Sequence, residues 1–148
     1  MSENEQNQGQ GQNMEKLQQR YQMLSQQLEG LQMGQEQVEE RLKEVKKARK
    51  SLKGLKDNDE TEAIMPIGGD SYIKAEIIST DKALVGLGGG YKAEKEIEGA
   101  VETLNSKLER INESKDRIDE SIEETKQELN QIQQKLAAAQ QQMQNQQR

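Results

Sequence analysis

The sequence predicts an α+β fold: a long antiparallel two-helix coiled coil with two central β-hairpins. Three observations support this prediction. Apolar residues recur in heptads in an N-terminal and a C-terminal segment, the block between them alternates with a period of two, and glycine-rich turns punctuate that block. A heptad repeat aligns apolar side chains along a narrow seam, so each helix needs a partner. Because the central block reverses the chain, we expect the two helices to pair with each other.

The two heptad registers account for most of the apolar residues in the chain. In the first segment, the seam is formed by Leu17, Leu24, Leu31, Val38, Val45 and Leu52 with Met14, Tyr21, Leu28 and Leu42. In the second, it is formed by Ile97, Leu104, Ile111, Ile118, Ile132 and Ala139 with Val101, Leu108, Ile122, Leu129, Leu136 and Met143. Polar residues interrupt the seam at Gln35, Arg49, Lys115 and Thr125. One antiparallel alignment would place Gln35 against Thr125, and an alignment one heptad shorter would not; the pattern leaves both open.

Four segments follow from these patterns. Residues 1–12 are polar without periodicity and are predicted to be a disordered tail. The first helix is expected over 13–56 with Asn13 as its cap, and the second over 94–148 with a frayed, glutamine-rich end. Two β-hairpins are expected over 57–93.

The central block carries the signals of strands and tight turns. Ile73, Ala75 and Ile77 alternate with polar residues, as in a strand with one buried face. Pro66 cannot donate to a strand ladder, so its strand is predicted to be an edge strand or to contain a bulge. Residues 91–95 form either a fourth strand or the approach to the second helix. Two isolated hairpins would leave unpaired edges, so the block is predicted to pair with the same block of other subunits.

Composition excludes several function classes. The chain has no Cys and no His, which removes thiol chemistry, imidazole catalysis and the usual zinc sites, and no catalytic residue, cofactor or metal is assigned. No apolar run is long enough to span a membrane, and residues 1–13 lack the features of a signal peptide, so we expect a cytoplasmic protein without membrane contact. The net charge of −6 argues against nucleic-acid binding. The basic stretch at 43–53 is expected to lie beside Glu94, Glu96, Glu98 and Glu102, which would neutralise it.

The central block resembles the prefoldin alpha subunit, in its archaeal form. The matching residues are Met65-Pro-Ile-Gly-Gly69, Ser71-Tyr-Ile-Lys-Ala-Glu76 and Asp81-Lys-Ala-Leu-Val-Gly-Leu-Gly-Gly-Gly-Tyr91, followed by Glu94-Lys95. The resemblance implies a hexameric co-chaperone of two alpha and four beta subunits, in which the hairpins join an oligomeric β-barrel. It also implies an ATP-independent holdase that captures unfolded polypeptides at its coiled-coil tips and delivers them to a group II chaperonin.

Two sets of residues are assigned to these roles. Client contact at the tips is predicted for Met14, Leu17, Tyr21, Met23, Leu24, Leu136, Ala139 and Met143. Oligomerisation is predicted for Ile67, Tyr72, Ile73, Ala75, Ile77, Val85 and Leu87. The flexible side chain of methionine suits apolar contact with varied partners. The equally supported interpretation is that these methionines only fill a loosely packed seam. The alternative function is a filament-forming or scaffold coiled-coil protein that assembles through its hairpins without binding clients.

Overall fold

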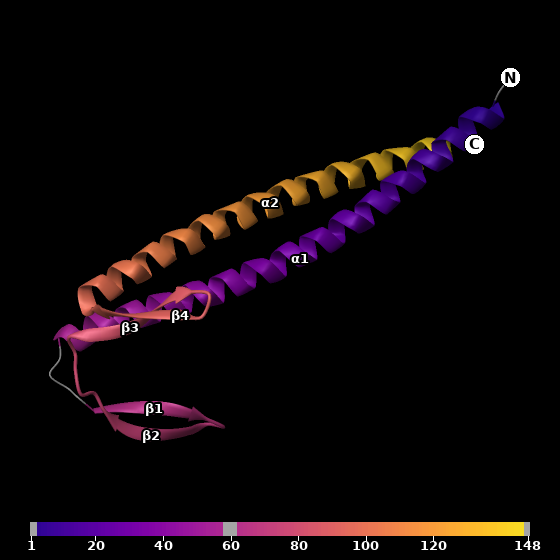
Figure 1. The fold of residues 1–148 in the computed structure, drawn as a ribbon. Coiled ribbons are helices and arrows are strands. Elements are labelled where there is room, and N and C mark those ends of the chain that lie inside the picture. Colours follow the sequence, from indigo (N-terminus) through magenta and orange to yellow (C-terminus); the bar gives the residue numbers. More distant parts are fainter. Residues whose placement is uncertain (1–2, 58–61, 147–148) are drawn as a thin grey trace. The chain divides into compact units, whose positions relative to one another are not determined.

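The structure is a computed structural model that describes residues 3–57 and 62–146. Its elements follow the order α1 (Glu3–Asp57), β1 (Glu62–Gly68), β2 (Ser71–Glu76), β3 (Lys82–Gly88), β4 (Tyr91–Glu96) and α2 (Ile97–Gln146) (Figure 1). The α+β class with two long helices and two small antiparallel hairpins is confirmed. Internal contacts divide the chain into a terminal unit (1–38 and 114–148) and a hairpin unit (39–113).

In the terminal unit, α1 and α2 pair antiparallel along the predicted heptad seam. Leu24, Ile122 and Ile132 are buried there, at 4%, 6% and 5% exposure. The antiparallel sense follows from two contacts: Gln133 Nε2 donates to the Tyr21 hydroxyl at 3.1 Å, and Gln35 Nε2 donates to Asp119 Oδ1 at 2.5 Å. Apolar side chains spaced every three and four residues therefore do bury one stripe of each helix.

The structure decides between the two seam alignments. Gln35 faces Asp119 and not Thr125, so the helices take the alignment one heptad shorter. Thr125 is buried and satisfies its hydroxyl within α2, because its Oγ1 donates to the Ser121 carbonyl at 2.7 Å. The seam thus has no shared polar layer of Gln35 and Thr125.

The N-terminal tail differs from its prediction. α1 begins at Glu3, well before the expected cap at Asn13, so the segment predicted to be disordered is helical from Glu3 onward. Gln and Glu, which dominate this segment, are favourable helix formers, and a helix that is already nucleated extends at little cost. Residues 1–2 lie outside the described residues. At the other end, α2 is helical through Gln146.

The two hairpins have the same internal design, displaced by about twenty positions along the chain. Glu62 pairs with Glu76 in the first, and Lys82 pairs with Glu96 in the second. Each has a register shift before its turn, between Pro66 and Gly68 and between Gly86 and Gly88. The strand that contains Pro66 is thus an edge strand with a register irregularity, in line with the two alternatives predicted for it.

The turns explain the glycine clusters. The two central turn residues have positive φ in both hairpins, 56° and 54° at Gly69 and Asp70 and 59° and 81° at Gly89 and Gly90. Two consecutive residues with positive φ are what a two-residue hairpin turn of type I′ requires. The glycine cluster 88–90 therefore closes a hairpin between β3 and β4.

The start of the second helix is later than predicted. Residues 91–96 form β4, so the fourth strand is the correct alternative and the hairpins extend beyond residue 93. Glu94 and Glu96 consequently lie on a strand and not in the first turn of α2. The Ile97 amide, at the first helical position, donates to the Asp81 carbonyl at 3.0 Å. This bond ties the start of α2 to the segment that leads into β3.

The core of the hairpin unit lies between β3–β4 and the helices. Val85, Ala100 and Leu104 are buried together, and Val45, Leu52 and Ala83 pack against them. Lys107 Nζ donates to the Gly86 carbonyl, and Lys95 Nζ donates to Thr103 Oγ1 at 2.9 Å. The second hairpin is therefore attached to its own helices by apolar packing and by hydrogen bonds at its edge.

Candidate functional site

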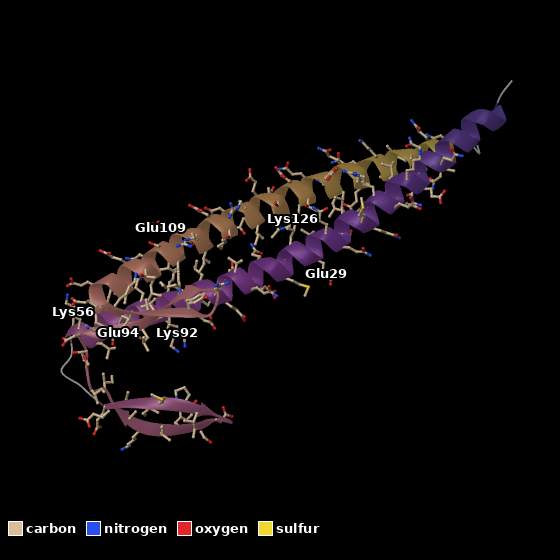
Figure 2. The ribbon with its side chains drawn as sticks, in the orientation of Figure 1. Glu29, Lys56, Lys92, Glu94, Glu109 and Lys126 are labelled. Atoms are coloured by element: carbon tan, nitrogen blue, oxygen red, sulfur yellow. The ribbon has the colours of Figure 1, made fainter. Side chains whose placement is uncertain are left out.

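The β1–β2 hairpin carries large apolar side chains on both of its faces. Met65 is paired with Ile73 on one face, and Pro66 with Tyr72 on the other. Met65, Ile73 and Tyr72 are 51%, 47% and 61% exposed. Figure 2 shows side chains standing out from both sides of the two strands. A two-stranded hairpin with both faces open is marginally stable in water, so this surface is suited to contact with other chains.

The second hairpin differs because one of its faces is already covered. Val85 occupies the position that Met65 occupies in the first hairpin, and it is only 5% exposed because it lies against Ala100 and Leu104. Leu84, on the opposite face, is 72% exposed. The second hairpin thus uses one apolar face within the chain and presents the other.

The predicted oligomerisation residues divide accordingly. Ile67, Tyr72, Ile73 and Leu87 are exposed, Ala75 and Ile77 are half-buried, and Val85 is buried inside its own chain. The sequence reading missed five exposed apolar residues of the same block, namely Ile64, Met65, Ile78, Leu84 and Tyr91. The signal that could have identified them is the run of apolar residues at consecutive positions. Such a run places apolar side chains on both faces of a strand, as in a hairpin that is open on both sides.

The predicted tip residues lie mainly within the seam. Leu24 is buried, and Met14, Leu17, Tyr21, Leu136, Ala139 and Met143 are half-buried. Met23 is the exception at 56% exposure, and Met33, which was not included in the set, is 58% exposed. The apolar surface presented by the helices in the terminal unit therefore includes two methionines outside the seam.

The basic stretch of α1 makes few direct contacts with the acids at the start of α2. Lys56 forms an ion pair with Glu98, which raises the pKa of Lys56 and lowers the pKa of Glu98 through their hydrogen bond. Within residues 3–57 and 62–146, however, no ion pair involves any lysine from 43 to 53. Arg49 Nη1 instead donates to Asn105 Oδ1 at 2.9 Å. The Lys56–Glu98 pair therefore places the acidic start of α2 beside the end of the basic stretch, and neutralisation of the lysines stays a prediction.

The described residues present apolar and charged surfaces for contact. In this part of the chain, no three metal-ligating side chains come together, and no helix is long and apolar enough to cross a membrane. The resolved pKa shifts belong to Lys56, Glu98 and Asp119, and their causes are side-chain hydrogen bonds on the helices. The geometry supports binding through apolar and charged surfaces.

Several curated proteins are similar in sequence, and all three described here are prefoldin alpha subunits. The protein from Haloarcula marismortui is 56% identical over 43 residues, covering 29% of this chain and 28% of that one. The protein from Methanococcus aeolicus is 35% identical over 97 residues, covering 64% and 66%. The protein from Pyrococcus horikoshii is 33% identical over 97 residues with the same coverage. The matched part spans less than two thirds of each relative.

A solved structure shares the fold. The filamentous PFD from Methanocaldococcus jannaschii, determined by cryo-electron microscopy, matches with a TM-score of 0.66 and 19% identity, covering 76% of this chain and 93% of that one. The model of the prefoldin subunit family matches residues 24–142, which include both hairpins and most of both helices. The chain is therefore a member of the prefoldin family, similar to its alpha subunits.

Proposed function

We propose that this chain is a subunit of an oligomeric chaperone that assembles through its hairpins. The observation that carries the proposal is the β1–β2 hairpin, whose apolar side chains are exposed on both faces. Burial of apolar area is the main driving force of association, and exposed strand edges supply backbone hydrogen bonds to a neighbouring strand. The similarity to prefoldin alpha subunits favours a complex of two such chains with four beta subunits, closed as a β-barrel.

The complex would act as an ATP-independent holdase in the cytoplasm. Its coiled-coil ends would capture unfolded polypeptides and deliver them to a group II chaperonin. Exposed Met23 supports this role, because its flexible and polarisable side chain adapts to varied apolar sequences. The half-buried seam residues near the same ends, such as Met14 and Met143, would join the contact if the helices separate locally.

Removal of both ends tests the holdase assignment. A chain lacking residues 1–24 and 136–148, co-expressed with a candidate beta subunit, should give a complex of the expected mass by light scattering. It should no longer suppress aggregation of a denatured client, while the full-length complex suppresses it. If the shortened complex suppressed client aggregation fully, the tip assignment would be refuted, while the proposal of assembly through the hairpins would stand.

A filament-forming protein is the second candidate. It is favoured by the solved structure of similar fold, which is a filamentous assembly. Electron microscopy of the purified single subunit separates the two: long filaments favour the scaffold, and a hexamer formed only with beta subunits favours the chaperone.

A further inference from the structure

One side of the helix pair in the hairpin unit carries opposite charges on its two helices. On α1, Lys46 and Lys53 lie one heptad apart; on α2, Glu102 and Glu109 do the same. All four side chains are exposed, and Figure 2 shows Glu109 on the outward side of α2. Lys43, Lys50 and Glu98 extend the same pattern. We call this surface the charged side.

Apart from Glu98, which forms an ion pair with Lys56, the charges named on this side form no ion pair within residues 3–57 and 62–146. Across the seam, Asn105 already accepts a hydrogen bond from Arg49. Within residues 3–57 and 62–146, neither Lys46 nor Lys53 forms an ion pair with Glu102, Glu109 or any other acid. The lysines and the glutamates thus remain available to a partner.

The opposite side of the same helix pair is occupied. Ala100 is fully buried beneath the second hairpin, and Lys107 binds the Gly86 carbonyl there. Ala100 and Lys107 lie at the heptad position that flanks the seam on the side away from Glu98 and Asn105. A second helix pair can therefore approach on the charged side without displacing the hairpin.

The heights of the charges along the helices match. The contacts of Arg49 with Asn105 and of Lys56 with Glu98 fix the register of α1 against α2. In this register, Lys53 lies at about the same position along the helix axes as Glu102, and Lys46 at about the same position as Glu109. A two-fold axis parallel to the helices would place α1 of one copy against α2 of the other at unchanged height. Such an isologous contact repeats each interaction twice.

We propose that the charged side binds the charged side of a second copy, with Lys46 against Glu109 and Lys53 against Glu102 across a two-fold axis. This inference rests on the proposed function, because joining the hairpins brings the same ends of two subunits together. Exposed ion pairs are individually weak and are screened by salt. The contact therefore orients neighbouring subunits and adds roughly tenfold to their affinity at low salt.

Reciprocal charge reversal tests the contact in the full-length chain. The Lys46→Glu/Lys53→Glu variant sets glutamate against glutamate in its own pairs, and the Glu102→Lys/Glu109→Lys variant sets lysine against lysine. A mixed pair restores both attractive contacts. Native mass spectrometry of an equimolar mixture, with one variant ¹⁵N-labelled, should show an excess of mixed pairs over statistical mixing in low salt. The excess should disappear when salt is raised, as screening requires.

The control is Arg41→Glu/Arg110→Glu, which changes the net charge equally at exposed positions off the charged side. Mixed with labelled wild-type chain, it should give statistical pairing. Statistical pairing of the two reciprocal variants at low salt would overturn the proposal. Weaker pairing of the lysine-reversed variant with itself, while the glutamate-reversed variant pairs with itself as wild type does, would also overturn it, because the lysines would then contact a different acidic partner. Either result leaves the hairpin assembly intact, whereas failure of that assembly would abolish every pair, including the wild-type one.

Discussion

Gln35 and Asp119 join α1 to α2 through a 2.5 Å hydrogen bond from Nε2 to Oδ1, and Lys115 Nζ contacts the other carboxylate oxygen at 2.6 Å. This cluster replaces an apolar layer at the edge of the seam. Polar residues at seam positions usually select one register at some cost in stability. In the observed alignment Gln35 donates to a carboxylate that Lys115 also contacts, and this charge-assisted cluster favours that alignment over one shifted by a heptad.

Asp119 should make stability depend on pH. Hydrogen bonds from Lys115 and Gln35 hold the pKa of Asp119 below its ordinary value of 3.8. A carboxyl group with a lowered folded-state pKa stabilises the fold above its unfolded pKa, and it loses that contribution as pH falls through the folded pKa. Asp119→Asn should therefore melt below wild type at pH 7, and the difference should shrink as pH falls below about 4. Thermal melts followed by circular dichroism measure this.

The control for that series is Asp116→Asn, an exposed acid on the same helix. Its melting temperature should track wild type across the pH range. A constant difference between wild type and Asp119→Asn at all pH values would contradict the assignment.

Leu104 should carry much of the stability of the hairpin unit. It is 7% exposed in the cluster with Val85 and Ala100. Leu104→Ala should lower the free energy of unfolding by about 2–4 kcal/mol, because it removes buried methyl groups and leaves a cavity. Leu84→Ala, at a leucine that is 72% exposed, should change it by no more than about 0.5 kcal/mol. Urea unfolding measures both, and equal effects would contradict the packing described.

Gly30 should lower the stability of α1, and its replacement by alanine should restore that stability. A Cβ built at Gly30 meets nothing within 4 Å, and the residue lies well inside the helix. Gly30→Ala should therefore raise the free energy of unfolding by about 0.5–1 kcal/mol. Gly68→Ala is the matched control and should destabilise, because Gly68 has a φ of 102°. A loss of stability in Gly30→Ala would mean that the helix needs the glycine.

Local patterns in the sequence predicted the helices, the seam and both hairpins because each depends on near neighbours. Heptads specify which residues of a helix are buried, and Gly69-Asp70 specifies a turn. The alignment of the two helices was not predictable, because the seam is apolar in either register and the choice depends on Gln35 meeting Asp119. The start of α2 at Ile97 was also missed, because its bond to Asp81 lies outside the helical pattern.

The candidate sites were predicted only in part. Exposed Ile73 was identified from alternation, whereas Val85, which lies in a short apolar run of the same block, is buried by its own helices. The same strand pattern appears in both hairpins, and only tertiary packing distinguishes the face used within the chain from the face left open. The individual partners of the basic stretch were not predictable for a similar reason, since Arg49 meets Asn105 while Glu98 pairs with Lys56, outside the stretch.

Assembly through the hairpins is tested directly by the mass of the complex after a charge is introduced on the open β1–β2 hairpin. Ile73→Asp should dissociate the complex formed with a beta subunit, because assembly would bury an unpaired carboxylate. Met33→Asp, the same kind of change at an exposed residue of α1, should leave the complex at full mass. Light scattering coupled to size-exclusion chromatography measures the mass of the complex formed by each variant. A full-mass complex with Ile73→Asp would contradict assembly through the hairpins.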